Sequence, residues 1–132
     1  VMDQFEGKRI LLAEDHPLNM EIAKKILEKK GILVTCAVDG REAVDRYKRE
    51  AAGYFNAILM DIRMPEMDGL EAARTIRALD KEDAKTIPII AMTANAYEED
   101  RKASADAGMN AHLTKPIQPQ ELYQELGHFL KK

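Results

Sequence analysis

Four apolar segments of this sequence each lead into a side chain that could take part in chemistry. Carboxylates gathered at one place repel one another, and a hard divalent cation such as Mg²⁺ makes the cluster tolerable. A lysine or a threonine hydroxyl can interact with phosphoryl oxygens, and an aspartate carboxylate can accept a phosphoryl group. If these side chains meet, they supply the parts for metal-assisted phosphoryl transfer. They are Glu14 and Asp15, Asp61, Thr93, and Lys115.

Asp61 has no ordinary structural explanation in the sequence. It ends the apolar run 57–60, whose lack of alternation is typical of a strand buried on both faces. An acid before a helix often serves as its cap, but Asp68 stands directly before the next helical pattern and fits that task better. Glu66 is explained by a turn. Asp61 therefore calls for a functional explanation.

The segments that must position these residues alternate between strand and helix patterns. This alternation predicts an α/β fold, a doubly wound parallel sheet of five strands with helices on both faces. The common strand order is 2-1-3-4-5, although a second order satisfies the same pattern. In the common order strands one and three are neighbours, so the three carboxylates converge. Strands are expected at 9–13, 32–38, 57–60, 87–92 and 111–114, and helices at about 17–30, 41–52, 69–79, 96–107 and 119–131.

Helical spacing also predicts which side chains face the core. Cys36, in an apolar run, is expected to be a small buried hydrophobic residue. Gly108 is expected to end the fourth helix. The inward residues of the first two helices are expected to be Leu18, Ile22, Ala23, Ile26 and Leu27, and then Ala43, Val44, Tyr47 and Ala51.

Length and composition set the outer limits. The 132 residues suit a single domain over 1–132, with a core of about 8–131, and the 45% apolar and 33% charged residues are ordinary for a globular chain. The net charge of −3 argues against nucleic-acid binding. The single cysteine excludes an internal disulfide, and no apolar run has transmembrane length. A start at Val1 suggests excision from a longer protein.

Four short motifs, in order, resemble the receiver domain of two-component response regulators. They are Glu14-Asp15, MDIRMPEMDG at 60–69, MTAN at 92–95 and LTKP at 113–116. The resemblance implies a flavodoxin-like (βα)5 fold in which Asp61 accepts a phosphoryl group from a phosphohistidine. It also implies that Thr93 is a switch hydroxyl and that Lys115 assists the reaction, with a cis Lys115–Pro116 bond. By the same resemblance Mg²⁺ is bound by Glu14, Asp15, Asp61 and the backbone carbonyl of Arg63, with Asp15 the more direct ligand of the acid pair.

The segment 14–27, EDHPLNMEIAKKIL, resembles receivers fused to hybrid histidine kinases. This implies a histidine kinase or a histidine-phosphotransfer domain as partner, a cytoplasmic location with a parent chain that can be membrane-anchored, and no membrane contact by the domain itself. The domain would catalyse its own phosphorylation and dephosphorylation as a monomer. Alternatives are a stand-alone response regulator, a binding module with an inactive acceptor site, and a small-molecule phosphatase or phosphotransferase.

His112 departs from the family pattern, which has Tyr or Phe three residues before the lysine. His112 either moves together with Thr93 on phosphorylation or is a half-buried strand residue without a switching role. The output surface is expected on helix 96–107, strand five and the last helix, with Tyr97, Arg101 and Tyr123 as contacts. His16 and His128 are expected to be solvated.

Overall fold

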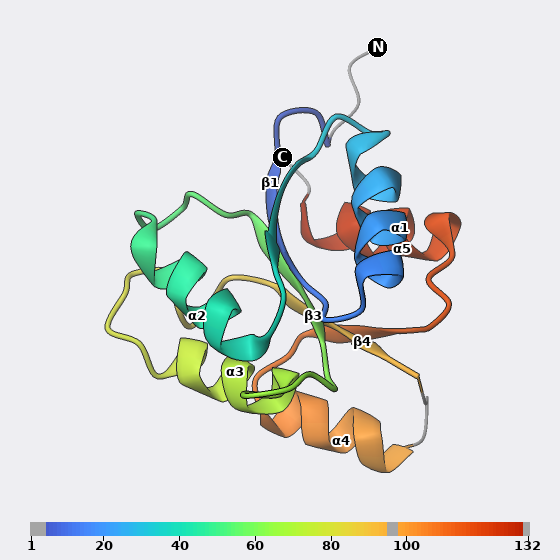
Figure 1. Cartoon of the computed structure of the whole chain (residues 1–132). Coiled ribbons are helices and arrows are strands. Elements are labelled where there is room, and N and C mark those ends of the chain that lie inside the picture. Colours follow the sequence, from blue (N-terminus) through green and yellow to red (C-terminus); the bar gives the residue numbers. More distant parts are fainter. Residues whose placement is uncertain (1–4, 95–97, 131–132) are drawn as a thin grey trace.

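The structure, a computed structural model, describes residues 5–94 and 98–130. Strands and helices alternate along the chain, as the sequence predicts (Figure 1). The elements are β1 (Arg9–Ala13), α1 (Pro17–Glu28), β2 (Leu33–Ala37), α2 (Gly40–Arg49), β3 (Ala57–Asp61), α3 (Gly69–Arg77), β4 (Ile89–Thr93), α4 (Glu98–Asp106), β5 (Ala111–Thr114) and α5 (Pro119–Phe129).

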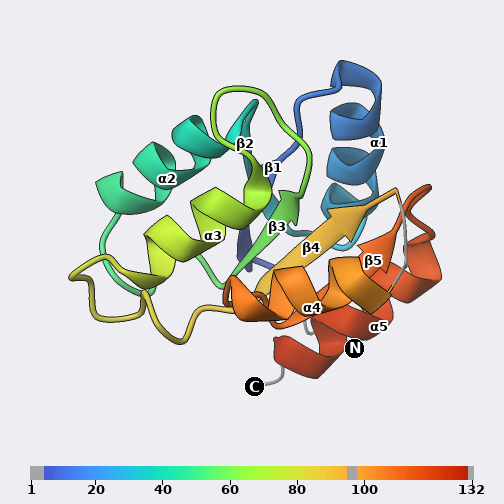
Figure 2. The ribbon, with the colours of Figure 1, turned by 90° about the horizontal axis from the view of Figure 1, so that it is seen from below.

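The five strands form one parallel sheet in the order β2-β1-β3-β4-β5, which confirms the predicted topology. Helices α1 and α5 cover one face, and α2, α3 and α4 lie on the other (Figure 2). Two apolar clusters fill the spaces between the sheet and these helix layers. Because both faces are covered, every residue of β3 and β4 is buried, and this explains why both strands are apolar up to their last residues, Asp61 and Thr93.

Aspartates cap the N-termini of α2 and α3. Asp39 precedes α2 and its side chain accepts a hydrogen bond of 2.8 Å from the Glu42 amide. Asp68 precedes α3 and accepts one of 2.8 Å from the Glu71 amide, which confirms its predicted capping role. Gly108, with φ of +98°, follows α4 as expected for a helix end that requires left-handed backbone.

Several predicted burials are wrong. Leu18 and Ile22 of α1 are 61% and 46% exposed, while Ala23 and Leu27 on the same helix are buried. Helical spacing identifies a face of the helix but not its width, and the buried face of α1 is narrower than the spacing predicts. Ala51 is exposed because α2 ends at Arg49, before that residue. Cys36 is only partly buried because β2 is an edge strand.

Strand β4 is displaced from its expected range of 87–92. It starts after Pro88, which lacks an amide proton for the sheet, and continues to Thr93. Thr93 is thus the last residue of the strand and pairs in register with Thr114 of β5. Among the described residues, the helices are too short or too polar to span a bilayer.

Candidate functional site

The carboxyl ends of β1 and β3 bring three acids together. Glu14 and Asp15 follow β1 directly, and Asp61 is the last residue of β3, its neighbour in the sheet. One ligand oxygen from each of the three carboxylates lies within 4.8 Å of the others. Asp61 is 4% exposed and Glu14 is similarly buried, whereas Asp15 faces solvent. The strand order thus creates the acidic cluster that the sequence predicts.

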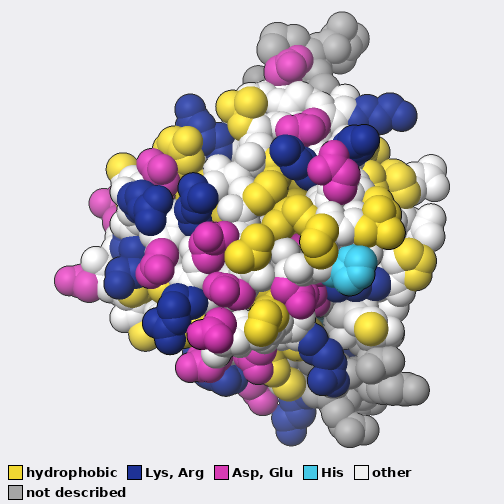
Figure 3. All heavy atoms as spheres, in the orientation of Figure 1, with side chains coloured by type: hydrophobic (Ala, Val, Ile, Leu, Met, Phe, Trp, Pro, Cys, Tyr) yellow, Lys and Arg dark blue, Asp and Glu magenta, His cyan; other side chains and the backbone are white. Residues whose placement is uncertain are grey.

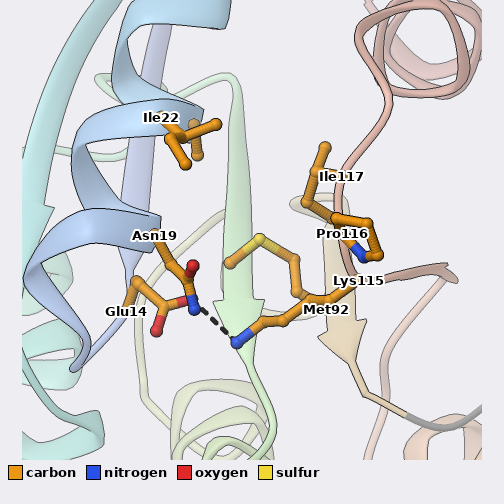
Figure 4. A pocket seen from close by; sticks show the side chains of 8 residues that line it. Glu14, Asn19, Ile22, Met92, Lys115, Pro116 and Ile117 are labelled. Carbon is orange, nitrogen blue, oxygen red and sulfur yellow. Dashed lines mark ion pairs between the residues drawn. The ribbon is translucent and has the colours of Figure 1, made fainter.

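Lys115 bridges two of these acids. Its Nζ atom lies 2.9 Å from Oε1 of Glu14 and 2.9 Å from Oδ2 of Asp61. Figure 4 shows the ammonium group reaching across from the β5–α5 connection towards Glu14 beneath α1. The Lys115 amide donates to the carbonyl of Thr93 over 2.7 Å, so the ends of β4 and β5 are joined beside the cluster. The Lys115–Pro116 bond is cis, as the resemblance implied.

The charges in this cluster are not balanced. Burial raises the pKa of Asp61 to about 6, and the negative charge of Glu14 adds to the rise, although the hydrogen bond from Lys115 acts in the opposite direction. Burial alone would lower the pKa of Lys115, but its hydrogen bonds to Asp61 and Glu14 outweigh burial and raise that pKa above its ordinary value. One lysine therefore faces more carboxylate charge than it neutralises.

The donor set suits a hard divalent cation. The three acids supply only oxygen atoms, and their mutual repulsion would be relieved by a double positive charge. Asp15, the exposed member, leaves the cluster open to solvent on one side. Arg63 lies at the rim, where its amide donates to Oδ1 of Asp61 over 3.3 Å. Residues for metal binding and an acidic acceptor therefore occupy the same small region.

The connection between β3 and α3 is a tightly closed loop. The Gly69 amide donates to the carbonyl of Ile62 over 2.8 Å, so residues 62–69 return to the point where β3 ends. A Cβ atom on Gly69 would lie 2.1 Å from the carbonyl oxygen of Asp61, so only glycine fits this close approach. Glu66, with φ of +66°, lies at the turn predicted for it.

The loop also rests on a neighbouring helix. The Gly40 amide, in the first turn of α2, donates to the carbonyl of Met67 over 2.9 Å. The sequence indicated only a turn at Asp39-Gly40, and nothing in its pattern could reveal this contact with a segment almost thirty residues later. Gly40 is thus a site-related residue that sequence reasoning missed.

Thr93 and His112 lie on adjacent strands near the cluster. Thr93 is buried at the end of β4. His112 is paired in register with Ala91, two residues before Thr93, and lines a surface groove together with Arg101 and Glu125. Burial and the Arg101 charge lower the pKa of His112, while Glu125 acts in the opposite direction. The histidine therefore occupies the position at which the resemblance expects an aromatic ring.

Two of the three expected output contacts can be placed. Arg101 is exposed on α4 and lines the same groove as His112. Tyr123 was wrongly assigned to this surface, because its hydroxyl donates to the Ile26 carbonyl of α1 over 2.7 Å. Tyr97, the third, lies outside the described residues. His16 and His128 are exposed, as predicted.

A pocket with apolar walls adjoins the cluster. Glu14 and Lys115 form its polar end, as Figure 4 illustrates. Ile22 and Ile117 approach it from α1 and from the β5–α5 connection, with Met92 between them. The exposed side of α1 is thus continuous with the reactive cluster. Helical periodicity predicts Ile22 to be in the core, so the sequence alone does not reveal this exposed face.

The sequence matches the family model described as "Response regulator receiver domain" over residues 10–127. Among curated proteins, it is 39% identical to the hybrid signal transduction histidine kinase I of Dictyostelium discoideum over 123 residues, which are 92% of this chain and 7% of that protein. The chain spans between 7% and 12% of the length of three histidine kinases that it matches, this one included.

Solved structures agree with this match. The receiver domain of sensor histidine kinase PA1611 from Pseudomonas aeruginosa PAO1, with a magnesium ion coordinated in its active-site cleft, is 41% identical with a TM-score of 0.85, covering 96% of this chain and 99% of that one. The receiver domain of Ssk1 from Saccharomyces cerevisiae, in complex with the histidine phosphotransfer protein Ypd1, is 28% identical with a TM-score of 0.83, covering 95% and 90%.

Proposed function

Because the chain belongs to the response regulator receiver family of two-component signalling, we propose that Asp61 accepts a phosphoryl group from a phosphohistidine of a partner protein. The observation that supports this most strongly is the bridging lysine: Nζ of Lys115 lies 2.9 Å from both Glu14 and Asp61. A lysine shared by two buried acids at the mouth of a parallel sheet is suited to binding an incoming phosphoryl group.

Mg²⁺ fits the proposed site. The carboxylates of Glu14, Asp15 and Asp61 and the backbone carbonyl of Arg63 are its proposed protein ligands, and the related receiver from Pseudomonas aeruginosa holds magnesium in its active-site cleft. When bound, the ion would neutralise carboxylate and phosphoryl charge. The remaining steps depend on residues of this chain.

In the proposed transfer, an Oδ atom of Asp61 attacks the phosphorus in line with the scissile N–P bond. The new O–P bond forms as the N–P bond breaks, and the electron pair of the N–P bond stays on the imidazole nitrogen of the donor. Lys115 neutralises phosphoryl charge during this step. The acyl phosphate then attracts the Thr93 hydroxyl, and His112 follows Thr93. The NMR signals of the His112 ring test this last step, because no change beyond that of distant residues would contradict it.

The proposed surface for the partner lies over α1. Leu18 and Ile22 are exposed there, and Figure 3 shows apolar side chains gathered over α1 and the adjacent strand β2. Ile22 also lines the pocket that ends at Lys115, so a partner seated on this surface could present its phosphohistidine to Asp61. The Ssk1 receiver binds the histidine phosphotransfer protein Ypd1, which supports a partner of this class.

This surface can be tested with Ile22→Ser. Since Ile22 is half exposed, the substitution should leave stability nearly unchanged while slowing transfer from a histidine-phosphotransfer protein about tenfold. Phosphorylation by a small phosphodonor should not change. Equal slowing with both donors would contradict the assignment.

The parent protein is proposed to be a hybrid histidine kinase, because the relatives that match include such kinases. A stand-alone regulator of the same chemistry remains the alternative for the whole protein. The chain is proposed to act as one monomeric domain over 1–132 in the cytoplasm, without binding nucleic acid.

The function can be tested by incubating the protein with Mg²⁺ and a small phosphodonor and measuring the intact mass. One labile phosphate is expected on the wild-type chain and none on Asp61→Asn. Turnover of the donor without a phosphorylated protein would favour a small-molecule phosphatase, and a folded protein that does not react would favour a pure binding module.

A further inference from the structure

We propose that Gly40, at the start of α2, is a positioning residue for the phosphoacceptor site. It supports the loop 62–69 from outside, and this loop carries the Arg63 carbonyl proposed for Mg²⁺ binding. The inference rests on the proposed function, because it concerns the geometry of that metal site.

The support is a direct backbone contact. The Gly40 amide donates to the Met67 carbonyl over 2.9 Å. A Cβ atom at Gly40 would lie 2.2 Å from that carbonyl oxygen and 3.0 Å from the carbonyl oxygen of Asp68. Both neighbours are backbone atoms, so they cannot rotate away as a side chain would. Any larger residue at position 40 must therefore displace the loop or the helix.

Glycine at this position is not explained by backbone conformation. Gly40 is not among the glycines with positive φ, and it lies in the first turn of a helix, where alanine is ordinarily the more stable residue. Asp39 already caps this turn through the Glu42 amide. The close approach of the loop is therefore the reason for glycine.

Displacement of the loop at Met67 would reach the reactive cluster. The loop is closed by the hydrogen bond from the Gly69 amide to the Ile62 carbonyl. Gly69 also packs against the carbonyl of Asp61. A shift of residues 67–69 therefore also shifts Ile62 and Arg63. The Arg63 amide in turn contacts the Asp61 side chain. Gly40 acts on the site through these backbone links and touches neither the metal ligands nor the phosphoryl group.

The test compares Gly40→Ala with the wild-type protein in two Mg²⁺ titrations. One follows the backbone amide signals of Asp61 and Arg63 by NMR, and the other follows the rate of phosphorylation by a small acyl phosphate. Gly40→Ala should require about tenfold more Mg²⁺ for half-saturation in both, as is typical when a residue that orients metal ligands is altered.

Gly53→Ala is the matched control. Gly53 has φ of +84° and no atom within 4 Å of a Cβ placed there, so alanine strains the backbone at a position remote from the loop. This variant should lose stability yet retain the wild-type requirement for Mg²⁺. If Gly53→Ala raised the half-saturating Mg²⁺ concentration as much as Gly40→Ala, general destabilisation would explain both variants, and the proposal would be overturned.

Asp39→Ala provides a second route if Gly40→Ala does not fold. It removes the cap of the same helical turn without adding an atom against the loop, and about a threefold rise in half-saturating Mg²⁺ is expected from the loosened support. A folded Gly40→Ala, or failing that Asp39→Ala, with wild-type Mg²⁺ binding would overturn the proposal. Binding of Mg²⁺ without phosphorylation of the wild-type chain would instead refute the proposed function, and the NMR titration would still test Gly40.

Discussion

Asp61 and Asp83 lie at opposite ends of the strands, the carboxyl edge and the amino edge of the sheet. Each is near a lysine, Lys115 for Asp61 and Lys81 for Asp83, but their environments differ. Asp61 is at the carboxyl edge, where Lys115 must serve both Asp61 and Glu14. Asp83 lies in the connection before β4, at the amino edge, where it accepts hydrogen bonds from the hydroxyl of Tyr47 and from the Gly53 amide.

The two environments shift the acids in opposite directions. Burial and Glu14 raise the pKa of Asp61 to about 6. Burial also acts to raise the pKa of Asp83, but the hydrogen bonds from Tyr47 and Gly53 and the charge of Lys81 outweigh it and lower that pKa. The negative charge of Asp83 is stabilised by hydrogen bonds and a lysine within the fold, whereas the negative charge of Asp61 requires a further positive charge, such as a bound cation. We infer that the amino edge stabilises the structure and the carboxyl edge performs the chemistry.

Loss of Lys115 should have the largest effect. Lys115→Met keeps much of the side-chain volume but removes the charge that Asp61 and Glu14 share. The rate of phosphorylation at saturating Mg²⁺ should fall about 100- to 1,000-fold, as when a preorganised donor is removed from other active sites. Lys81→Met, at the amino edge, should leave that rate unchanged in the same assay. A loss below threefold for Lys115→Met would contradict the assigned role.

Loss of Asp83 should affect stability alone. Asp83→Ala leaves the buried hydroxyl of Tyr47 without this partner and should lower the free energy of unfolding by about 2 kcal/mol. Urea unfolding measures the change. Phosphorylation of the folded variant should proceed at the wild-type rate, and a marked slowing would show that the two edges are not separate.

Neutralising Asp61 should have a smaller and opposite effect. With its pKa raised in the folded state, metal-free wild-type protein loses stability as the pH rises from about 4 to about 6, because folding then disfavours ionisation. Asp61→Asn should remove this dependence and gain about 1 kcal/mol at pH 7. Urea unfolding at several pH values in a chelator checks this. Destabilisation at pH 7 would mean that the ion pair with Lys115 outweighs the repulsion.

The sequence predicted the elements and the strand order because both follow from apolar periodicity and the alternation of strand with helix. It also predicted that Glu14, Asp15, Asp61 and Lys115 meet, since each ends or follows a strand and parallel strands end at one edge. The elements, the strand order and the positions of these four residues follow from local sequence pattern and topology, and both can be inferred from one sequence.

Contacts between distant segments could not be predicted in this way. The hydrogen bond between Tyr47 and Asp83 joins residues 36 positions apart, and neither residue type implies the other. Gly40 and Met67 meet only after α2 and α3 pack side by side. Exposure of Leu18 and Ile22 depends on how far the sheet extends beneath α1, and helical spacing does not contain that information.

Chemical trapping identifies the side chain that carries the phosphoryl group, which is proposed to be Asp61. Borohydride reduces an aspartyl phosphate to homoserine, so the wild-type protein phosphorylated by a phosphohistidine donor can be reduced, digested and sequenced by mass spectrometry. Homoserine is expected at position 61, and Glu14, Asp15 and Asp83 are expected to remain unmodified. Homoserine at any other aspartate, or a labile phosphate that leaves position 61 unchanged, would contradict it.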